Sequence, residues 1–418
     1  MTESAGASPT GRADATPPLS PPQPTALTLT APEPVTPVVQ SQAPVMAPQV
    51  SPERLPALDD RVEGYLTALL KNQTRSPAFA RQADNVRTMG DADLRRAAET
   101  SERQLQIPVK ASQEGGLSQG STVGRALLEL RQTVEELDPS QATAPRKFLG
   151  IPYGDRVAEY FRRYQGAQGR LDAVLRDLRD GQDELTRDNV ALNLEKQHLW
   201  SVMVRLNAYV YVAEQLDGRL QEKIAELEPL DLERARALSQ DVLRHVRQKH
   251  QDLLTQLAVS IENYLAVDVV IATNLELVKG VDRASTTTVS MLRTAVVVAQ
   301  ALTKEGLVLD QVAALSTTTA DPVQRTSDLL RDSSASDQEQ PASTPGMPQL
   351  QDAFADVHRT LDAVDAFRAE ALTSLGTTIG LLEQEVARSR GYLDRVSPSG
   401  SAPASGALEL GAEAGTQG

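Results

Sequence analysis

The sequence predicts an all-α protein in which long, coiled-coil-like helices form an elongated antiparallel helical bundle between disordered N- and C-terminal tails. Apolar residues recur every seven positions through 155–228, which is the repeat of helices that pack along a shared seam. Of the 418 residues, 40% are apolar but only 3% are aromatic. A core of Leu, Val and Ala suits a thin bundle better than a thick globular interior.

The first 56 residues are expected to form a disordered, proline-rich arm (1–56). They hold thirteen of the 25 prolines, and proline fixes φ and removes the backbone donor that helices and strands need. Such an arm is either a plain flexible segment or a docking segment for a partner. Residues 57–110 are expected to form short helices, because Leu58, Val62 and Leu69 recur at helical spacing.

Residues 111–332 are expected to form the helical coiled-coil core. A loop rich in Gly and Ser at 111–121 precedes an amphipathic helix that ends before Pro139. The seven-residue stripe follows, and it comprises Val157, Tyr164, Leu171, Leu178, Leu185, Leu192, Leu199, Leu206, Ala213, Leu220 and Leu227. At about 1.5 Å per residue, roughly 70 helical residues would span about 100 Å.

A second apolar seam accompanies the stripe but fails in its middle. Gly181, Asp188 and Glu195 stand where apolar residues are expected. Glycine inside a helix also costs about 1 kcal/mol relative to alanine. We therefore expect the helix to kink or break near 178–185 and its pieces to pack in a bundle.

The chain after this helix is expected to return along it and to end in one more helix. The short turn at Pro229 predicts an antiparallel hairpin. The two most apolar stretches of the chain follow and are typical of core helices. Residues 333–348 are expected to be a flexible linker, 349–396 a C-terminal helix that packs on the core, and 397–418 a disordered tail.

Charge and composition exclude several classes of function. The formal net charge of −14 argues against a nucleic-acid binder, whose affinity comes largely from Lys and Arg on phosphates. Without cysteine, the chain has no disulfide, no Cys-based zinc site and no thiol that reduces an oxyanion. The N-terminus does not resemble a secretory signal, and we expect no transmembrane segment and a cytoplasmic location.

The sequence also lacks the motifs of catalysis and of cofactor binding. It contains no HExxH, P-loop, GxGxxG or GxSxG pattern. Two of its four histidines, His245 and His250, are five residues apart and so do not share a helix face as an i, i+4 pair would. We therefore expect no enzyme activity, no catalytic residue, no cofactor and no metal site.

One helix, 274–302, carries a candidate anion-binding face. Val, Leu and Ala gather on one side of its helical wheel, and cations and hydroxyls on the other. Both groups donate hydrogen bonds to oxyanions. The candidate site residues are Lys279, Arg283, Thr287, Ser290 and Arg293. The alternative is that the Thr hydroxyls bond back to helical carbonyls and the cations pair with Glu and Asp.

These residues lie in the part of the chain that most resembles a known family. The sequence resembles the toxic anion resistance (TelA-like, tellurite resistance) family over about 123–396. The stretch GVDRASTTTVSMLRTAVVVAQAL is the most distinctive, with Ser285 where Thr is common. The resemblance implies a cytoplasmic, helical protein that accompanies resistance to tellurite and related stresses, and it supplies no catalytic residue. The other resembling stretches are 151–168, 188–200, 246–270 and 308–331.

Two hypotheses of function follow from these observations. The first is a non-enzymatic helical scaffold in a resistance assembly, whose partners are other stress-resistance proteins or a second copy of itself. The alternative is a protein that binds an oxyanion such as tellurite directly on the cationic, hydroxyl-lined helix face. An enzyme such as a tellurite reductase is disfavoured because the chain has neither cysteine nor a nucleotide motif.

Overall fold

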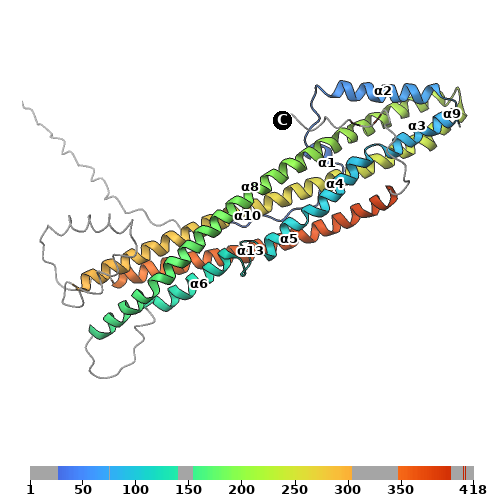
Figure 1. Ribbon diagram of the computed structural model, residues 1–418. Helices are drawn as coiled ribbons and strands as arrows, with labels where there is room; N and C mark the ends of the chain where they lie inside the picture. The colour runs from blue at the N-terminus through green and yellow to red at the C-terminus, as the bar shows by residue number, and fades with distance from the viewer. Residues whose placement is uncertain are drawn as a thin grey trace, which may run out of the picture.

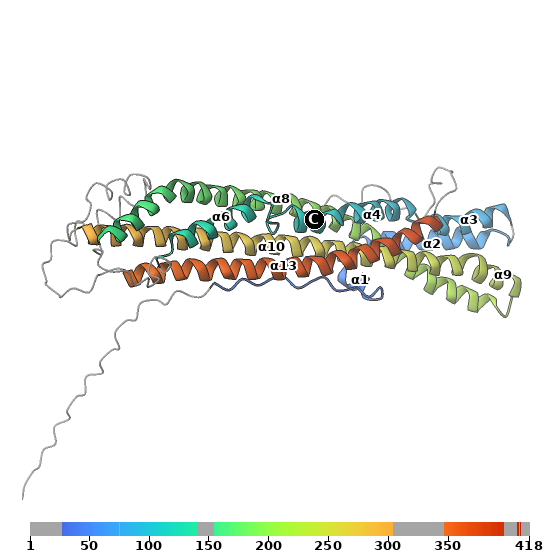
Figure 2. The same cartoon turned by 90° about the horizontal axis from the view of Figure 1, so that it is seen from below.

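The computed structural model describes residues 27–74, 76–139, 154–303 and 347–396, together with Leu408 and Leu410. All regular structure in these residues is helical, and it forms an elongated bundle (Figures 1 and 2). Helices α8 (Gly154–Leu227) and α10 (Arg244–Thr303) run antiparallel along its length, and α13 (Met347–Val396) lies along α10. The predicted all-α, elongated antiparallel bundle is confirmed.

Shorter helices flank this central group. Serine and aspartate side chains cap three of them, because Ser76, Ser121 and Asp231 each accept the backbone N–H three residues further on. The flanking elements are α1 (Ala43–Met46), α2 (Leu55–Lys71), α3 (Pro77–Thr88), α4 (Asp91–Gln104), α5 (Gln106–Gln113), α6 (Thr122–Leu137), α9 (Leu232–Ala237) and the π-helical turn η1 (Leu238–Leu243).

Helix α8 is continuous through the position where a break was expected. Gly181 lies against α6, where an added Cβ would stand 2.4 Å from Val123 Cγ2. The glycine thus permits close approach of two helices instead of ending one. The predicted break at 178–185 is wrong, because packing of an amphipathic face outweighs the low helix propensity of a single glycine.

The seven-residue stripe of α8 is buried inside this chain. Leu178, Leu206 and Leu220 are fully covered, and Leu192 is half-buried. A short turn after Leu227 reverses the chain into α9 and η1, which lead into α10. Because the bundle itself covers the stripe, this surface is not available for pairing with another protein.

The buried apolar residues form two clusters, one at each end of the bundle. The first joins α6, the N-terminal part of α8, the C-terminal part of α10 and α13. The second joins α1–α4, the C-terminal part of α8, η1 and the N-terminal part of α10. Helices α8 and α10 pass through both clusters and connect them.

One stretch, Leu232–Val298, is long and apolar enough by length and composition to cross a membrane. Of its most apolar window, 72% is buried by the rest of the bundle. Its apolar character is therefore that of a helix at the centre of a protein core. The expectation that the chain has no transmembrane segment stays a prediction.

The second half of the proline-rich arm is ordered, which corrects the predicted disorder for residues 27–56. Residues 27–41, which we name the N-terminal strap, run extended beside α13 (Figure 2). Proline favours such an extended conformation, and side chains of α10 and α13 supply its hydrogen-bond partners. These bonds join Ser374 Oγ to the Pro32 carbonyl (2.6 Å), the Val35 N–H to Thr378 Oγ1 (3.1 Å), the Val38 N–H to Glu262 Oε1 (2.7 Å) and Gln40 Nε2 to Thr255 Oγ1 (2.9 Å).

The predicted C-terminal tail also touches the bundle. Leu408 is buried in the second apolar cluster, and the Leu410 N–H donates to Tyr209 Oη at 3.0 Å. These two residues correct the expected disorder locally. The rest of that tail, residues 1–26 of the arm and most of the 333–348 linker lie outside the described residues.

Candidate functional site

The five predicted anion-binding residues all lie on α10, and they form a long row instead of a cluster. From Lys279 to Arg293 is fourteen residues, or about 21 Å along a helix axis. A single small oxyanion cannot bridge that length. Lys279 and Arg293 are exposed, whereas Thr287 is buried.

Two of the five already have partners within α10. Lys279 Nζ forms an ion pair with Glu276 one turn away. The Thr287 hydroxyl donates to the carbonyls of Arg283 (2.9 Å) and Ala284 (3.1 Å), as Ser and Thr often do inside helices. The alternative interpretation of the sequence, with hydroxyls on carbonyls and cations on carboxylates, therefore describes this part of the face.

The other three residues keep their polar groups available. Among the described residues no side-chain hydrogen bond or ion pair engages Arg283, Ser290 or Arg293. Arg283 is half-buried, while Ser290 and Arg293 are exposed. Arg283 is the residue of the row whose guanidinium combines partial burial with donors that no described side chain engages, which suits anion binding best.

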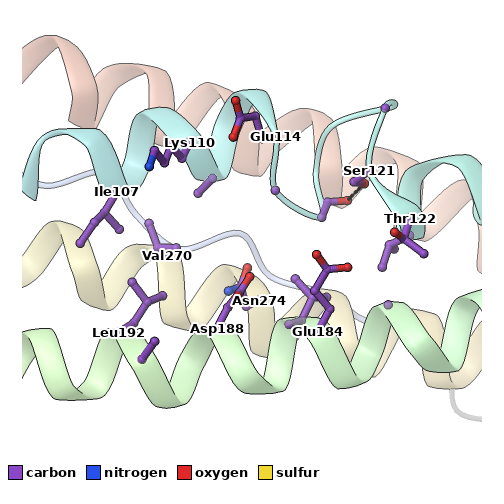
Figure 3. Close-up of a pocket in the computed structure, with 18 of the residues that line it drawn as sticks. Ile107, Lys110, Glu114, Ser121, Thr122, Glu184, Asp188, Leu192, Val270 and Asn274 are labelled. Atoms are coloured by element: carbon purple, nitrogen blue, oxygen red, sulfur yellow. Dashed lines mark hydrogen bonds between the residues drawn. The ribbon is translucent and has the colours of Figure 1, made fainter.

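A hollow of about 530 Å³ lies elsewhere, between α5, the loop after it, α8 and α10 (Figure 3). The carboxylates of Glu114, Glu184 and Asp188 line it, against the two cations Lys110 and Arg125. Its charge is therefore acidic overall, which disfavours an oxyanion. The predicted anion-binding residues do not reach this hollow.

The middle of α8 exposes several large apolar side chains. Val190 and Leu194 are each 62% exposed, and Trp200 is 49% exposed. We name these three residues the α8 face. Trp200 extends toward α10, where its ring lies 6.0 Å from that of Tyr264. Val190 and Leu194 lie one turn apart on the same side of α8, and neighbouring exposed apolar side chains of this kind are typical of surfaces that bind a partner.

Lys196, at the edge of the α8 face, links α8 to α10. Lys196 Nζ forms an ion pair with Asp268 of α10 and lies 4.4 Å above the ring of Tyr264. The bonds to Asp268 and Tyr264 raise the pKa of Lys196 against the opposing effect of burial. The lysine therefore stays charged and fixes α8 to α10 beside Trp200.

Buried polar residues lie between the two apolar clusters, and we call them the polar belt. Asn274 Nδ2 donates to Asn189 Oδ1 at 2.9 Å, and Gln104 Nε2 donates to Glu195 Oε2 at 2.7 Å. Asp188 and Glu195, which interrupt the predicted second seam, are themselves exposed at the edge of this belt: Asp188 lines the hollow, and Glu195 accepts from the buried Gln104. Further members are Ser101, Gln256, Glu262, Glu385 and Ser389.

Glu262 is the member of the polar belt whose pKa is raised most. It is 1% exposed, and its Oε2 has no hydrogen-bond partner. Burial raises the pKa of Glu262 to about 7, with a further increase from the charge of Glu385. The N–H of Val38 and the charge of Arg388 oppose this shift.

The histidines add no site within the described residues. Burial lowers the pKa of His250, and burial together with Arg87 lowers that of His245. His358 Nε2 lies 3.3 Å from Asp138. Across the ranges that the structure describes, no group of three His, Cys, Asp or Glu side chains is placed to hold a metal ion.

Sequence reasoning missed the hollow, the polar belt and the α8 face. A signal for the α8 face was present, because Val190 and Leu194 are apolar at positions outside both seams of the seven-residue repeat. No comparable signal marked Glu262, which looks in the sequence like one of many helical glutamates. Its burial depends on α13 and on the strap, which are distant along the chain.

Comparison with known proteins found one match. The family model described as toxic anion resistance protein (TelA) matches residues 76–395. No curated protein and no solved structure matches the chain. The matched residues include the three longest helices, α8, α10 and nearly all of α13, together with α6.

Proposed function

The chain belongs to the toxic anion resistance protein (TelA) family, and we propose that it serves this resistance as a non-enzymatic helical scaffold that binds other proteins. Membership of the family supports the role in toxic anion resistance. The scaffold mechanism, the absence of catalysis and a cytoplasmic location are parts of the proposal. It involves no nucleic acid and no cofactor.

The observation that carries the scaffold proposal is the α8 face. A bundle that covers most of the seven-residue stripe nonetheless leaves Val190, Leu194 and Trp200 exposed along α8. Val190 and Leu194 are four residues apart and therefore lie on the same side of α8. A row of this kind fits the apolar ridge of a partner helix, and we propose a helix of another stress-resistance protein as its partner.

The first prediction tests this face by charge substitution. Leu194→Asp is expected to abolish tellurite resistance in cells, because a carboxylate cannot be buried unpaired in an apolar contact. The thermal unfolding temperature of the purified variant should stay within a few degrees of wild type, since the side chain is 62% exposed. Resistance is measured as survival of a strain that depends on this chain.

Leu128→Asp is the matched control, because Leu128 is 52% exposed on α6, away from the α8 face. It should leave both resistance and stability unchanged. Wild-type resistance in the Leu194→Asp strain would contradict the proposal. Sedimentation of the wild type and the variant then distinguishes a second copy of the chain from a different protein as the partner.

Direct oxyanion binding remains the second candidate, favoured by the half-buried guanidinium of Arg283, which no side chain in the described part of the chain engages. The second prediction is that calorimetry with millimolar tellurite gives heat that is lost in Arg283→Ala. The same titration of Arg293→Ala should show little change, because Arg293 lies about 15 Å further along the helix. Absence of heat, or equal heat from Arg283→Ala, would remove this candidate.

A further inference from the structure

The N-terminal strap lies on the surface of the bundle, with only one of its side chains fully buried. Of its residues 27–41, Val35 alone is buried, while Leu27, Leu29 and Ala31 pack half-buried against the first apolar cluster and Val38 against the second. Gly280 of α10 admits Leu29, since an added Cβ would stand 3.0 Å from Leu29 Cδ1. The strap forms no hydrogen-bonded element of its own over 27–39. Its attachment therefore depends on the side chains of α10 and α13 that bond to its backbone.

One of these attachments ends on a buried carboxyl that lacks a counterion of its own. The Val38 N–H donates to Glu262 Oε1 at 2.7 Å, while Glu262 Oε2 is buried without a partner. Arg388 of α13 is the cation that acts on Glu262, but it is engaged by Glu385 at 2.6 Å. An ionised carboxylate in this position lacks the hydration and pairing that its charge requires.

The other charged groups around Glu262 do not neutralise it. The strap carries a single charged residue, Glu33, which is exposed and negative. On α10 itself, Asp268 forms its ion pair with Lys196 of α8. From α13, Glu385 and Arg388 form the pair already described. The strap therefore covers a carboxyl group that is more easily buried with its proton than without it.

We propose that the strap is a proton-linked latch, which docks between α10 and α13 while Glu262 is protonated and is released when Glu262 ionises. Release lets water reach the carboxylate, so the released state favours the ionised form and the docked state favours the protonated form. By linkage, a rise in pH must then weaken docking. This inference concerns the regulation of the fold and does not depend on the scaffold proposal.

The size of the pH effect on docking follows from the pKa of Glu262 in the docked and in the released state. The pKa of Glu262 is about 7 with the strap docked, against an ordinary value of 4.5. If release restores the ordinary value, the docking equilibrium should fall about tenfold between pH 6 and pH 8. The docked state keeps its full advantage only below pH 4.5, and that advantage is lost progressively as the pH rises through about 7.

The third prediction is tested by hydrogen exchange of the full chain, followed by mass spectrometry on peptides that cover residues 30–41. After correction for the intrinsic exchange rate at each pH, protection of these peptides should be about tenfold lower at pH 8 than at pH 6. Peptides from the middle of α13 should keep the same protection at both pH values. Equal protection of the strap at the two pH values would overturn the latch.

Two variants separate the latch from a general loosening of the strap. Glu262→Gln keeps an oxygen that accepts the Val38 N–H but cannot ionise, so its strap should be equally protected at both pH values. Thr378→Val removes the acceptor of the Val35 N–H and should lower protection at both pH values while the tenfold ratio persists. A tenfold ratio that survives in Glu262→Gln would also overturn the latch.

A third variant keeps the test valid if Glu262→Gln does not fold. Glu385→Gln removes the negative charge that raises the pKa of Glu262 and frees Arg388. The midpoint of the pH response of the strap should therefore move to lower pH. An unchanged midpoint in this variant would contradict the assignment of Glu262 as the titrating group.

Discussion

Lys249 and Asp91 form an ion pair in the interior of the bundle, where their side chains are only 4% and 12% exposed. Truncating one partner of such a pair typically costs about 3–5 kcal/mol, because the other charge remains buried alone. Asp91 also lies in the first turn of α4, where the helix dipole stabilises a carboxylate. The two charges can therefore be buried together, in contrast to Glu262.

The acidity of Glu262 has a consequence for the stability of the whole chain. Its pKa is raised from 4.5 to about 7 in the folded state, so the folded state binds more protons than the unfolded state between these values. The contribution of Glu262 to stability is full below pH 4.5 and is lost as the pH rises through about 7. His250 has the opposite sign, because its lowered pKa favours folding as the pH rises.

At the scale of the element, the packing of α8 against α6 depends on Gly181, the glycine near which the sequence predicted a break in the helix. Gly181 touches Val123 of α6, and α6 and α8 share extensive contacts. If Gly181 marked a weak point of the helix, alanine would stabilise α8 by up to about 1 kcal/mol. If it serves close packing, alanine must push against Val123.

The fourth prediction tests whether alanine at position 181 stabilises or destabilises the protein. Gly181→Ala should destabilise the protein by about 1–3 kcal/mol, the range for overpacking, in chemical denaturation. Gly166→Ala and Gly218→Ala are matched controls within α8, since neither glycine has a neighbour within 4 Å of an added Cβ. Both should be neutral or stabilising. Relief of the Gly181→Ala defect by Val123→Ala would identify the contact, and stabilisation by Gly181→Ala alone would contradict it.

The same helix shows how much of the fold the sequence could predict. The seven-residue stripe predicted a long helix buried along one side, and Leu178, Leu206 and Leu220 are indeed fully covered. The helical period could not reveal that Gly181 meets another helix, because that contact depends on tertiary packing. Order in the strap was equally hidden, since Thr378 lies more than 340 residues from Val35.

The candidate site was less predictable than the fold for a related reason. The wheel of α10 grouped cations and hydroxyls by angle, but it gave no information about the neighbours that engage Lys279 and Thr287. The helical period also concealed the axial spread of the five residues. A helical wheel gives only the angle of each residue around the helix axis. Residues that bind one small ion must also lie close together along that axis.

At the scale of the whole molecule, two apolar clusters are joined end to end with a polar belt between them. A compact single core would have required the chain to fold back across its own width. Here α8 and α10 pass straight through both clusters, so the length of these helices sets the length of the molecule. A scaffold benefits from this arrangement, because its binding surfaces are held apart at fixed distances.

The fifth prediction concerns this length. Helix α8 has 74 residues, which corresponds to about 110 Å along its axis. A rod of that length has a radius of gyration of roughly 32 Å, whereas a compact domain with the same number of residues would have about 22 Å. Small-angle X-ray scattering of the monomer, with its mass checked by sedimentation, should therefore give at least about 32 Å. A value near that of the compact domain would mean that α8 folds back on itself in solution, and it would contradict both the continuous helix through Gly181 and the separation of the two apolar clusters.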